Sequence, residues 1–233
     1  MKRSKQMSES IELGILLALS GGFMDAYSYI YRDHVFANAQ TGNILLFGVH
    51  LAEKNWAEAL HYLFPISAFV IGIALAEMIR MKTDQRKVHW RQICVLLEAC
   101  VLASVACFPQ SMNTAANSLI SCACGIQVET FRKIRGQGIA TTMCVGNLRS
   151  ATQSLCECWH TKNKKAAERG MLYYGIIFCF VIGAVLGNIC INYLKGKAIL
   201  VCVGLLAAVF LLMFVDKEKE EKETVAKRRA DAR

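Results

Sequence analysis

Residues 11–31 have the sequence IELGILLALSGGFMDAYSYIY, an apolar stretch in which Asp25 is the only charged residue beyond the first turn. A helix of about 20 apolar residues is long enough to cross the hydrocarbon core of a bilayer. In this chain of 233 residues 55% are hydrophobic, which excludes a soluble enzyme, a disulfide-linked secreted protein and a disordered protein. Five similar stretches follow, at residues 57–80, 92–109, 113–131, 170–193 and 198–215. The sequence therefore predicts an all-α membrane protein with six transmembrane helices.

Two further segments are too short and too polar to be ordinary spans. They are FANAQTGNILLFGVHL at 36–51 and IATTMCVGNLRSATQSL at 139–155, each with a Gly-Asn pair near its middle. Polar side chains and non-helical backbone are tolerated at membrane depth only inside protein or beside water. We therefore expect both segments to be re-entrant or broken helical segments, each returning to the side of the membrane from which it came.

The distribution of basic residues supports this topology. With both segments re-entrant, the N-terminus, the connections at 80–91 and 162–169 and the C-terminal tail all face the cytoplasm. Of the 27 Lys and Arg residues, the outer face then holds only Arg32, Lys54, Lys195 and Lys197. Cytoplasmic loops of membrane proteins are enriched in Lys and Arg. We therefore predict a multi-pass protein with both termini in the cytoplasm, and the net charge of +9 does not indicate nucleic-acid binding.

The two halves of the chain share a pattern. A shift of 104 positions aligns Gly21 with Gly125, Asp25 with Glu129, Gly42 with Gly146 and Asn43 with Asn147. The sequence FVIG at 69–72 recurs at 180–183, after an insertion in the lysine-rich loop. Since each half contains three spans, the second copy enters the membrane upside down. The sequence thus predicts an inverted 3+3 repeat, an arrangement common in transporters.

The repeat suggests where a functional site lies. The predicted regions are a cytoplasmic N-terminus (1–10), a first three-helix repeat (11–109), a second, inverted repeat (113–215) and a charged cytoplasmic tail (216–233). Sites in inverted repeats lie near the membrane midplane between the copies. We expect a short helix to start at each Gly-Asn pair, with Asn as its cap and its free N–H groups pointing to the midplane. The residues expected to bind a solute or ion are Asp25, Thr41, Gly42, Asn43, Gln127, Glu129, Gly146, Asn147 and Arg149.

Charged residues inside the apolar segments each have two interpretations. Asp25 and Glu129 either line the central site, where they bind a cation or carry a proton, or cap and pair with nearby groups; Arg132 is a partner within reach of Glu129. Glu98 is either a coupling carboxylate or the partner of Arg149. Arg149 in turn either contacts an anionic substrate or neutralises an acid.

Several motifs resemble those of the YoaK-like family of bacterial membrane proteins. The first half carries GFMDA at 22–26 and HVFANAQTGN at 34–43, and the second half carries Gly125-Ile126-Gln127, Thr141-Thr142 and Gly146-Asn147. Val128 and Val145 depart from the family pattern, which often has Asn and Thr at these positions. The resemblance covers about residues 11–215. It implies six helices in a bacterial inner membrane and no established substrate.

These features favour a transporter or channel for a small solute or ion in the bacterial cytoplasmic membrane. The acidic residues favour a cation, whereas the helix N-termini and Arg149 favour an anion, and both stay open. The alternative is a non-transporting membrane sensor or assembly partner that acts through the charged tail. The predicted partners are the solute or ion, the lipid bilayer and further copies of the chain.

No enzymatic activity is predicted. The sequence contains no G-x-S-x-G, H-E-x-x-H or Walker motif. Asp25 and Glu129 as an intramembrane hydrolase pair lack any flanking signature. The eleven cysteines are scattered through apolar segments, where Cys packs as a small apolar residue. We therefore predict neither a cofactor nor a metal site.

Overall fold

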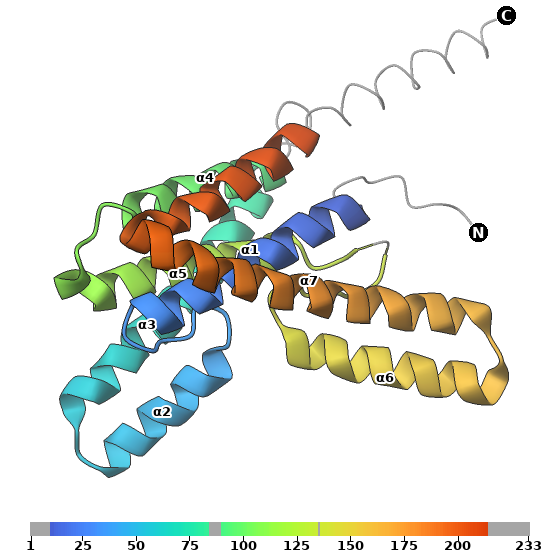
Figure 1. Cartoon of the computed structure of the whole chain (residues 1–233), viewed down its shortest axis with the longest axis horizontal. Helices are drawn as coiled ribbons and strands as arrows, with labels where there is room; N and C mark the ends of the chain where they lie inside the picture. The colour runs from blue at the N-terminus through green and yellow to red at the C-terminus, as the bar shows by residue number, and fades with distance from the viewer. Residues whose placement is uncertain (1–9, 84–89, 135, 214–233) are drawn as a thin grey trace, which may run out of the picture.

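The structure is a computed structural model that describes residues 10–83, 90–134 and 136–213 (Figure 1). Its elements are α1 (Ile11–Tyr31), α2 (Gln40–Ala52), α3 (Trp56–Lys82), α4 (Trp90–Val105), η2 (Gln110–Met112), α5 (Asn113–Thr130), α6 (Cys144–Thr161), α7 (Lys164–Leu194) and η3 (Lys195–Ile199). Residues 200–213 form one more helix. The described residues form helices and no strand, which agrees with the predicted all-α fold. The predicted tail (216–233) and all but Ser10 of the predicted N-terminal region lie outside the described residues.

Three stretches of described helix are long and apolar enough to cross a membrane: α1, α3 and the stretch Lys164–Met213. The third, of 50 residues, contains the predicted span 170–193 and the described part, 198–213, of the predicted span 198–215, with η3 between the two helices. Helix α4 is shorter, with 16 residues, and α5 carries polar side chains along its length. The lengths and composition of these helices are those of an integral membrane protein.

The beginnings of the helices follow from local sequence. Three helices start at a polar side chain that accepts a hydrogen bond from the first turn: Ser10 for α1, Asn55 for α3 and Asn163 for α7. Such caps satisfy N–H groups that have no partner within the helix. The residues before α2 and α6 are Ala39 and Met143, whose side chains make no cap. The N-termini of these two helices therefore depend on other parts of the chain.

Glycines allow two pairs of helices to approach closely. Gly22 of α1 lies against the carbonyl of Phe180 in α7, and Gly125 of α5 lies against the carbonyl of Phe69 in α3, so that neither position has room for a Cβ atom. Each partner helix also places a glycine against this interface: Gly72 of α3 lies against the carbonyl of Cys122 in α5, and Gly183 of α7 lies against the carbonyl of Leu19 in α1. Phe69 and Phe180 occupy the same place in the repeated FVIG sequence. The contacts therefore match Gly22, rather than Gly21, with Gly125, a shift of one residue from the sequence alignment.

Helices α1 and α5 cross each other in opposite directions at the centre of the molecule (Figure 1). Contacts between them join Leu17 to Gln127, Met24 to Cys124 and Arg32 to Asn117. The numbers rise along the first helix while they fall along the second, so the two helices are antiparallel. Helix α1 packs on α7 and on the helix 200–213, whereas α5 packs on α3 and α4. The first helix of each half therefore packs against the later helices of the other half.

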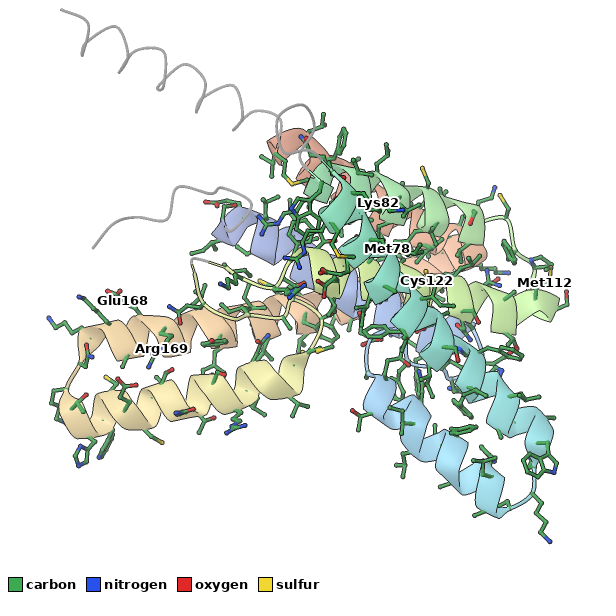
Figure 2. All side chains as sticks on the ribbon, turned by 180° about the vertical axis from the view of Figure 1, so that it is seen from behind. Met78, Lys82, Met112, Cys122, Glu168 and Arg169 are labelled. Carbon is green, nitrogen blue, oxygen red and sulfur yellow. The ribbon has the colours of Figure 1, made fainter. Side chains whose placement is uncertain are left out.

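Two hairpins, α2–α3 and α6–α7, extend from this centre (Figure 1). Helix α2 is apolar and exposes Ile44 and Leu45. Helix α6 is more polar, and Arg169 of α7 donates to Ser154 and Glu157 across the second hairpin. Figure 2 shows Glu168 and Arg169 near the tip of this hairpin, away from the helices that carry Met78 and Cys122.

Candidate functional site

Residues 36–51, the first of the two segments predicted to be re-entrant, are held against α1 by Asp25. The Oδ1 atom of Asp25 accepts a hydrogen bond of 2.7 Å from the N–H of Asn38, and the carboxylate also accepts from the N–H groups of Ala37 and Ala39. These groups stand at the start of α2, which has no side-chain cap of its own. A carboxylate in this place satisfies the free N–H groups and the positive end of the helix dipole. Asp25 thus caps α2 from a different helix, as in the structural interpretation of this residue.

Asn43 fastens the loop rather than capping the helix. Helix α2 begins at Gln40, so Thr41, Gly42 and Asn43 already lie inside it, and the predicted cap at Asn43 is wrong. The side chain of Asn43 is buried. It accepts from the N–H of Phe36 (3.1 Å) and donates to the carbonyl of Phe36 (2.7 Å) and to Gln40 (2.9 Å).

Asn147 does the same for the second re-entrant segment. Helix α6 begins at Cys144, and the buried side chain of Asn147 donates to the carbonyl of Ala140 at 2.6 Å. The spacing of seven residues equals that between Phe36 and Asn43. The two asparagines aligned by the sequence repeat therefore play the same structural part, which neither the cap prediction nor the motif alone indicated.

The two loops meet on α1 at Gly21. Asn38 of the first loop donates to the Gly21 carbonyl at 3.0 Å. From the second loop, the methyl group of Thr142 would lie 2.9 Å from a Cβ atom at Gly21. Gln127 of α5 donates to the carbonyl of Leu17 (3.0 Å) and to the hydroxyl of Thr141 (3.2 Å). Both re-entrant segments and both crossing helices therefore contribute to one buried polar cluster, which we call the loop junction: Leu17, Gly21, Asp25, Asn38, Gln127, Thr141 and Thr142.

Three oxygen atoms of the loop junction have no hydrogen-bond partner among the residues that the structure describes. They are Oδ1 of Asn38, Oε1 of Gln127 and Oγ1 of Thr142, all in side chains that are at most 3% exposed. A buried polar atom without a partner costs roughly 1–3 kcal/mol. Three such oxygen atoms in one cluster indicate that a ligand or a water molecule supplies the missing hydrogen bonds or coordinates these oxygens.

Other predicted site residues lie apart from the loop junction. Glu129 forms an ion pair with Arg132, which was its structural alternative, and Arg132 also pairs with Glu77 at 3.3 Å. Arg149 is exposed on α6, and Glu98 is buried in α4, so the predicted pair between them does not form. Thr41 and Gly146 are exposed at the starts of α2 and α6.

Arg32, directly after α1, makes contacts that the sequence did not predict. Its side chain is 0% exposed. It donates to the hydroxyl of Tyr27, to Oδ1 of Asn113 and to the carbonyls of Val105, Phe108 and Pro109. These carbonyls follow the end of α4, where a cation also complements the helix dipole. A signal was present, since Arg32 directly follows the first span on the face predicted to be poor in basic residues.

Among the described residues, no group of three or more His, Cys, Asp or Glu side chains is arranged to hold a metal ion. The loop junction combines one carboxylate with amide and hydroxyl oxygens. This donor set suits a small cation or a solute rich in hydrogen-bond donors.

Comparison with known proteins gives one family. A family model described as "Protein of unknown function (DUF1275)" matches residues 13–212. The chain is 26% identical over 180 residues to the UPF0700 transmembrane protein YoaK of Bacillus subtilis (strain 168), covering 73% of this chain and 79% of that protein. No solved structure shows significant similarity to the chain.

Proposed function

The chain belongs to the DUF1275, YoaK-like family of membrane proteins, and from this premise we propose that it moves a small cation or donor-rich solute across the bacterial cytoplasmic membrane. The observation that carries the proposal is the loop junction, in which two loops from opposite halves of the chain meet on α1 and leave three buried oxygens without partners. The proposal assigns the protein no enzymatic activity and needs no partner besides solute and bilayer.

We propose that six helices cross the membrane and that α2 and α6 are re-entrant, with the two halves forming an inverted repeat. The opposed directions of α1 and α5 and the matched contacts of Gly22 and Gly125 support the inversion. Figure 1 shows the start of α1 and the end of the helix 200–213 on the same side of the molecule, as an even number of spans requires. Both termini would then be cytoplasmic, in line with the distribution of basic residues.

The preference for a cation follows from how charges are used at the junction. The helix N-termini and Arg149 had favoured an anion. The positive end of α2 is already satisfied by Asp25, and Arg149 is exposed and makes no contact with the junction residues among the described hydrogen bonds. What the junction offers instead is oxygen, as the carboxylate of Asp25 and the three unpartnered acceptors.

The test is flux into proteoliposomes that contain the full-length protein, with sodium, potassium and methylammonium ions as probes. Thr142→Val removes a hydroxyl and keeps the shape of the side chain. Because one hydrogen bond to a ligand is worth about 1–1.5 kcal/mol, we expect this variant to slow the flux of a transported probe roughly tenfold. The matched control is Thr161→Val, at the exposed end of α6, which should leave flux unchanged.

Two results would contradict the proposal. One is that none of the probes crosses faster than in protein-free liposomes. The other is that Thr142→Val and Thr161→Val have the same probe flux, while deletion of residues 216–233 changes the phenotype of cells that express the protein. That pair of results would favour a protein that acts through its tail.

A further inference from the structure

Glu98 is a buried acid that the proposed solute site does not use. Its side chain in α4 is 0% exposed, and neither carboxyl oxygen has a hydrogen-bond partner among the described residues. It lies in the main apolar cluster, which includes Val95 and Leu102 of the same helix and Leu206 of the helix 200–213. No described Lys, Arg or His side chain forms a hydrogen bond with it.

The titratable groups near Glu98 are thiols. Cys94 lies one turn earlier in the same helix, and Cys124 of α5 and Cys202 of the helix 200–213 belong to the same apolar cluster as Val95 and Leu102. Helix α3 and η3 also contact α4, but none of their described charged side chains forms a hydrogen bond with Glu98. These surroundings cannot compensate a negative charge.

An ionised carboxylate here would be very costly, because burial of an unpaired charge costs many kcal/mol. The carboxyl must therefore carry a proton in this conformation. Even then its O–H group lacks an acceptor, which costs roughly 1–3 kcal/mol. An apolar side chain at this position would stabilise the fold better, so the acid does not serve stability.

One residue connects the surroundings of Glu98 with the loop junction. Cys124 of α5 is buried in the same apolar cluster as Val95 and Leu102, which lie within about one turn of Glu98 in α4. Cys124 also contacts Met24, the neighbour of Asp25, at 3.8 Å between the sulfur atoms. Cys124 therefore packs both among the apolar residues around Glu98 and against a residue next to the loop junction.

We propose that Glu98 is a proton-binding site that couples solute movement to the movement of one proton. In the conformation described here the carboxyl holds the proton. In a second conformation, which exposes α4 to water, the O–H bond breaks, the proton passes to water and the electron pair stays on the carboxylate oxygen. This inference rests on the proposed function, because a proton can be coupled only to a solute that moves.

Infrared spectroscopy of the full-length protein in liposomes tests whether Glu98 holds a proton. A protonated carboxyl has a C=O band that shifts in heavy water. We expect Glu98→Gln to remove part of this band, and the control Glu58→Gln, at an exposed carboxyl of α3, to leave it unchanged. Identical spectra for wild type and Glu98→Gln at neutral pH would overturn the assignment.

Flux under a pH difference tests the coupling. With one proton exchanged for each probe ion, wild-type protein should accumulate a transported probe up to about tenfold per unit of pH difference. Glu98→Gln should abolish this accumulation and still exchange labelled for unlabelled probe. The wild-type arm does not depend on the folding of any variant.

The two proposals fail in different ways. If a probe crosses the membrane but no pH difference drives its accumulation, coupling by Glu98 is overturned and the proposed function stands. If none of the probes crosses, the proposed function is overturned and the coupling falls with it.

Discussion

The two re-entrant segments share a plan and differ in how firmly they are held. In both, an asparagine at the start of a short helix bonds to a carbonyl seven residues earlier, Asn43 to Phe36 and Asn147 to Ala140. The first segment is also held by Asp25 at the start of α2, and the loop that leads to it begins at Arg32, whose buried side chain bonds to the end of α4 and the turn after it. In the second segment, α6 starts after Met143 without a side-chain cap.

The difference arises from one residue of register. In the glycine contacts Gly22 corresponds to Gly125, which places Val128 opposite Asp25 in the repeat. Valine cannot cap a helix, and the neighbouring Glu129 pairs with Arg132 instead. The first loop thus has a carboxylate at the start of its helix, and the second loop has none. Segments with fewer ties open at lower free energy, so we expect the second loop to move in any cycle that exposes the junction.

The largest loss of stability is expected when the buried cation at the start of the first loop, Arg32, is removed. Arg32→Ala leaves several carbonyls of the turn after α4 without donors. Loss of such a buried network costs roughly 3–5 kcal/mol, so we expect a strongly lowered Tm in thermal unfolding of the detergent-solubilised protein. Arg149→Ala, at an exposed arginine of the second segment, should change stability by at most about 0.5 kcal/mol. If Arg32→Ala and Arg149→Ala lowered the free energy of unfolding by similar amounts, the two loops would not differ in how firmly they are held.

A smaller effect is expected from the two acids that the sequence aligned. Asp25→Ala removes the cap of α2 and should cost about 1–2 kcal/mol, with faster hydrogen exchange at residues 37–39. Glu129→Ala breaks an ion pair whose arginine is half exposed, and should cost at most about 1 kcal/mol without affecting either loop. Equal protection of residues 37–39 in Asp25→Ala and wild type would show that the carboxylate does not hold the first loop.

The sequence predicted the elements better than their contacts. Apolar length located α1, α3 and α7, because a span is a property of composition. The repeat located both short helices through their Gly-Asn pairs. It misplaced Asp25 relative to the second half, because an alignment cannot see which glycine a neighbouring backbone touches. It also gave no sign that the side chain of Arg32 is buried, since the acceptors of this residue come from the end of α4 and the turn after it, far away in the sequence.

The smallest effect is expected at the glycines of the two Gly-Asn pairs. Both lie inside helices, Gly42 in α2 and Gly146 in α6. A Cβ atom at Gly146 would meet no atom within 4 Å, whereas one at Gly42 would lie 2.8 Å from the ring of Phe36. Alanine favours a helix over glycine by about 0.5–1 kcal/mol, so Gly146→Ala should raise the Tm slightly.

At Gly42, the stabilisation that alanine brings to the helix is offset by a steric clash. The Phe36 ring would have to move, and this ring stacks on Tyr29 in α1. We therefore expect Gly42→Ala to be neutral or destabilising, and the two variants to shift the Tm in different directions. If Gly42→Ala stabilised the protein as much as Gly146→Ala, the first loop would have the freedom that this structure assigns only to the second. If Gly146→Ala lowered the Tm or abolished flux, the start of α6 would have to leave the helical conformation in a second state, which would place the movement of the transport cycle at that turn.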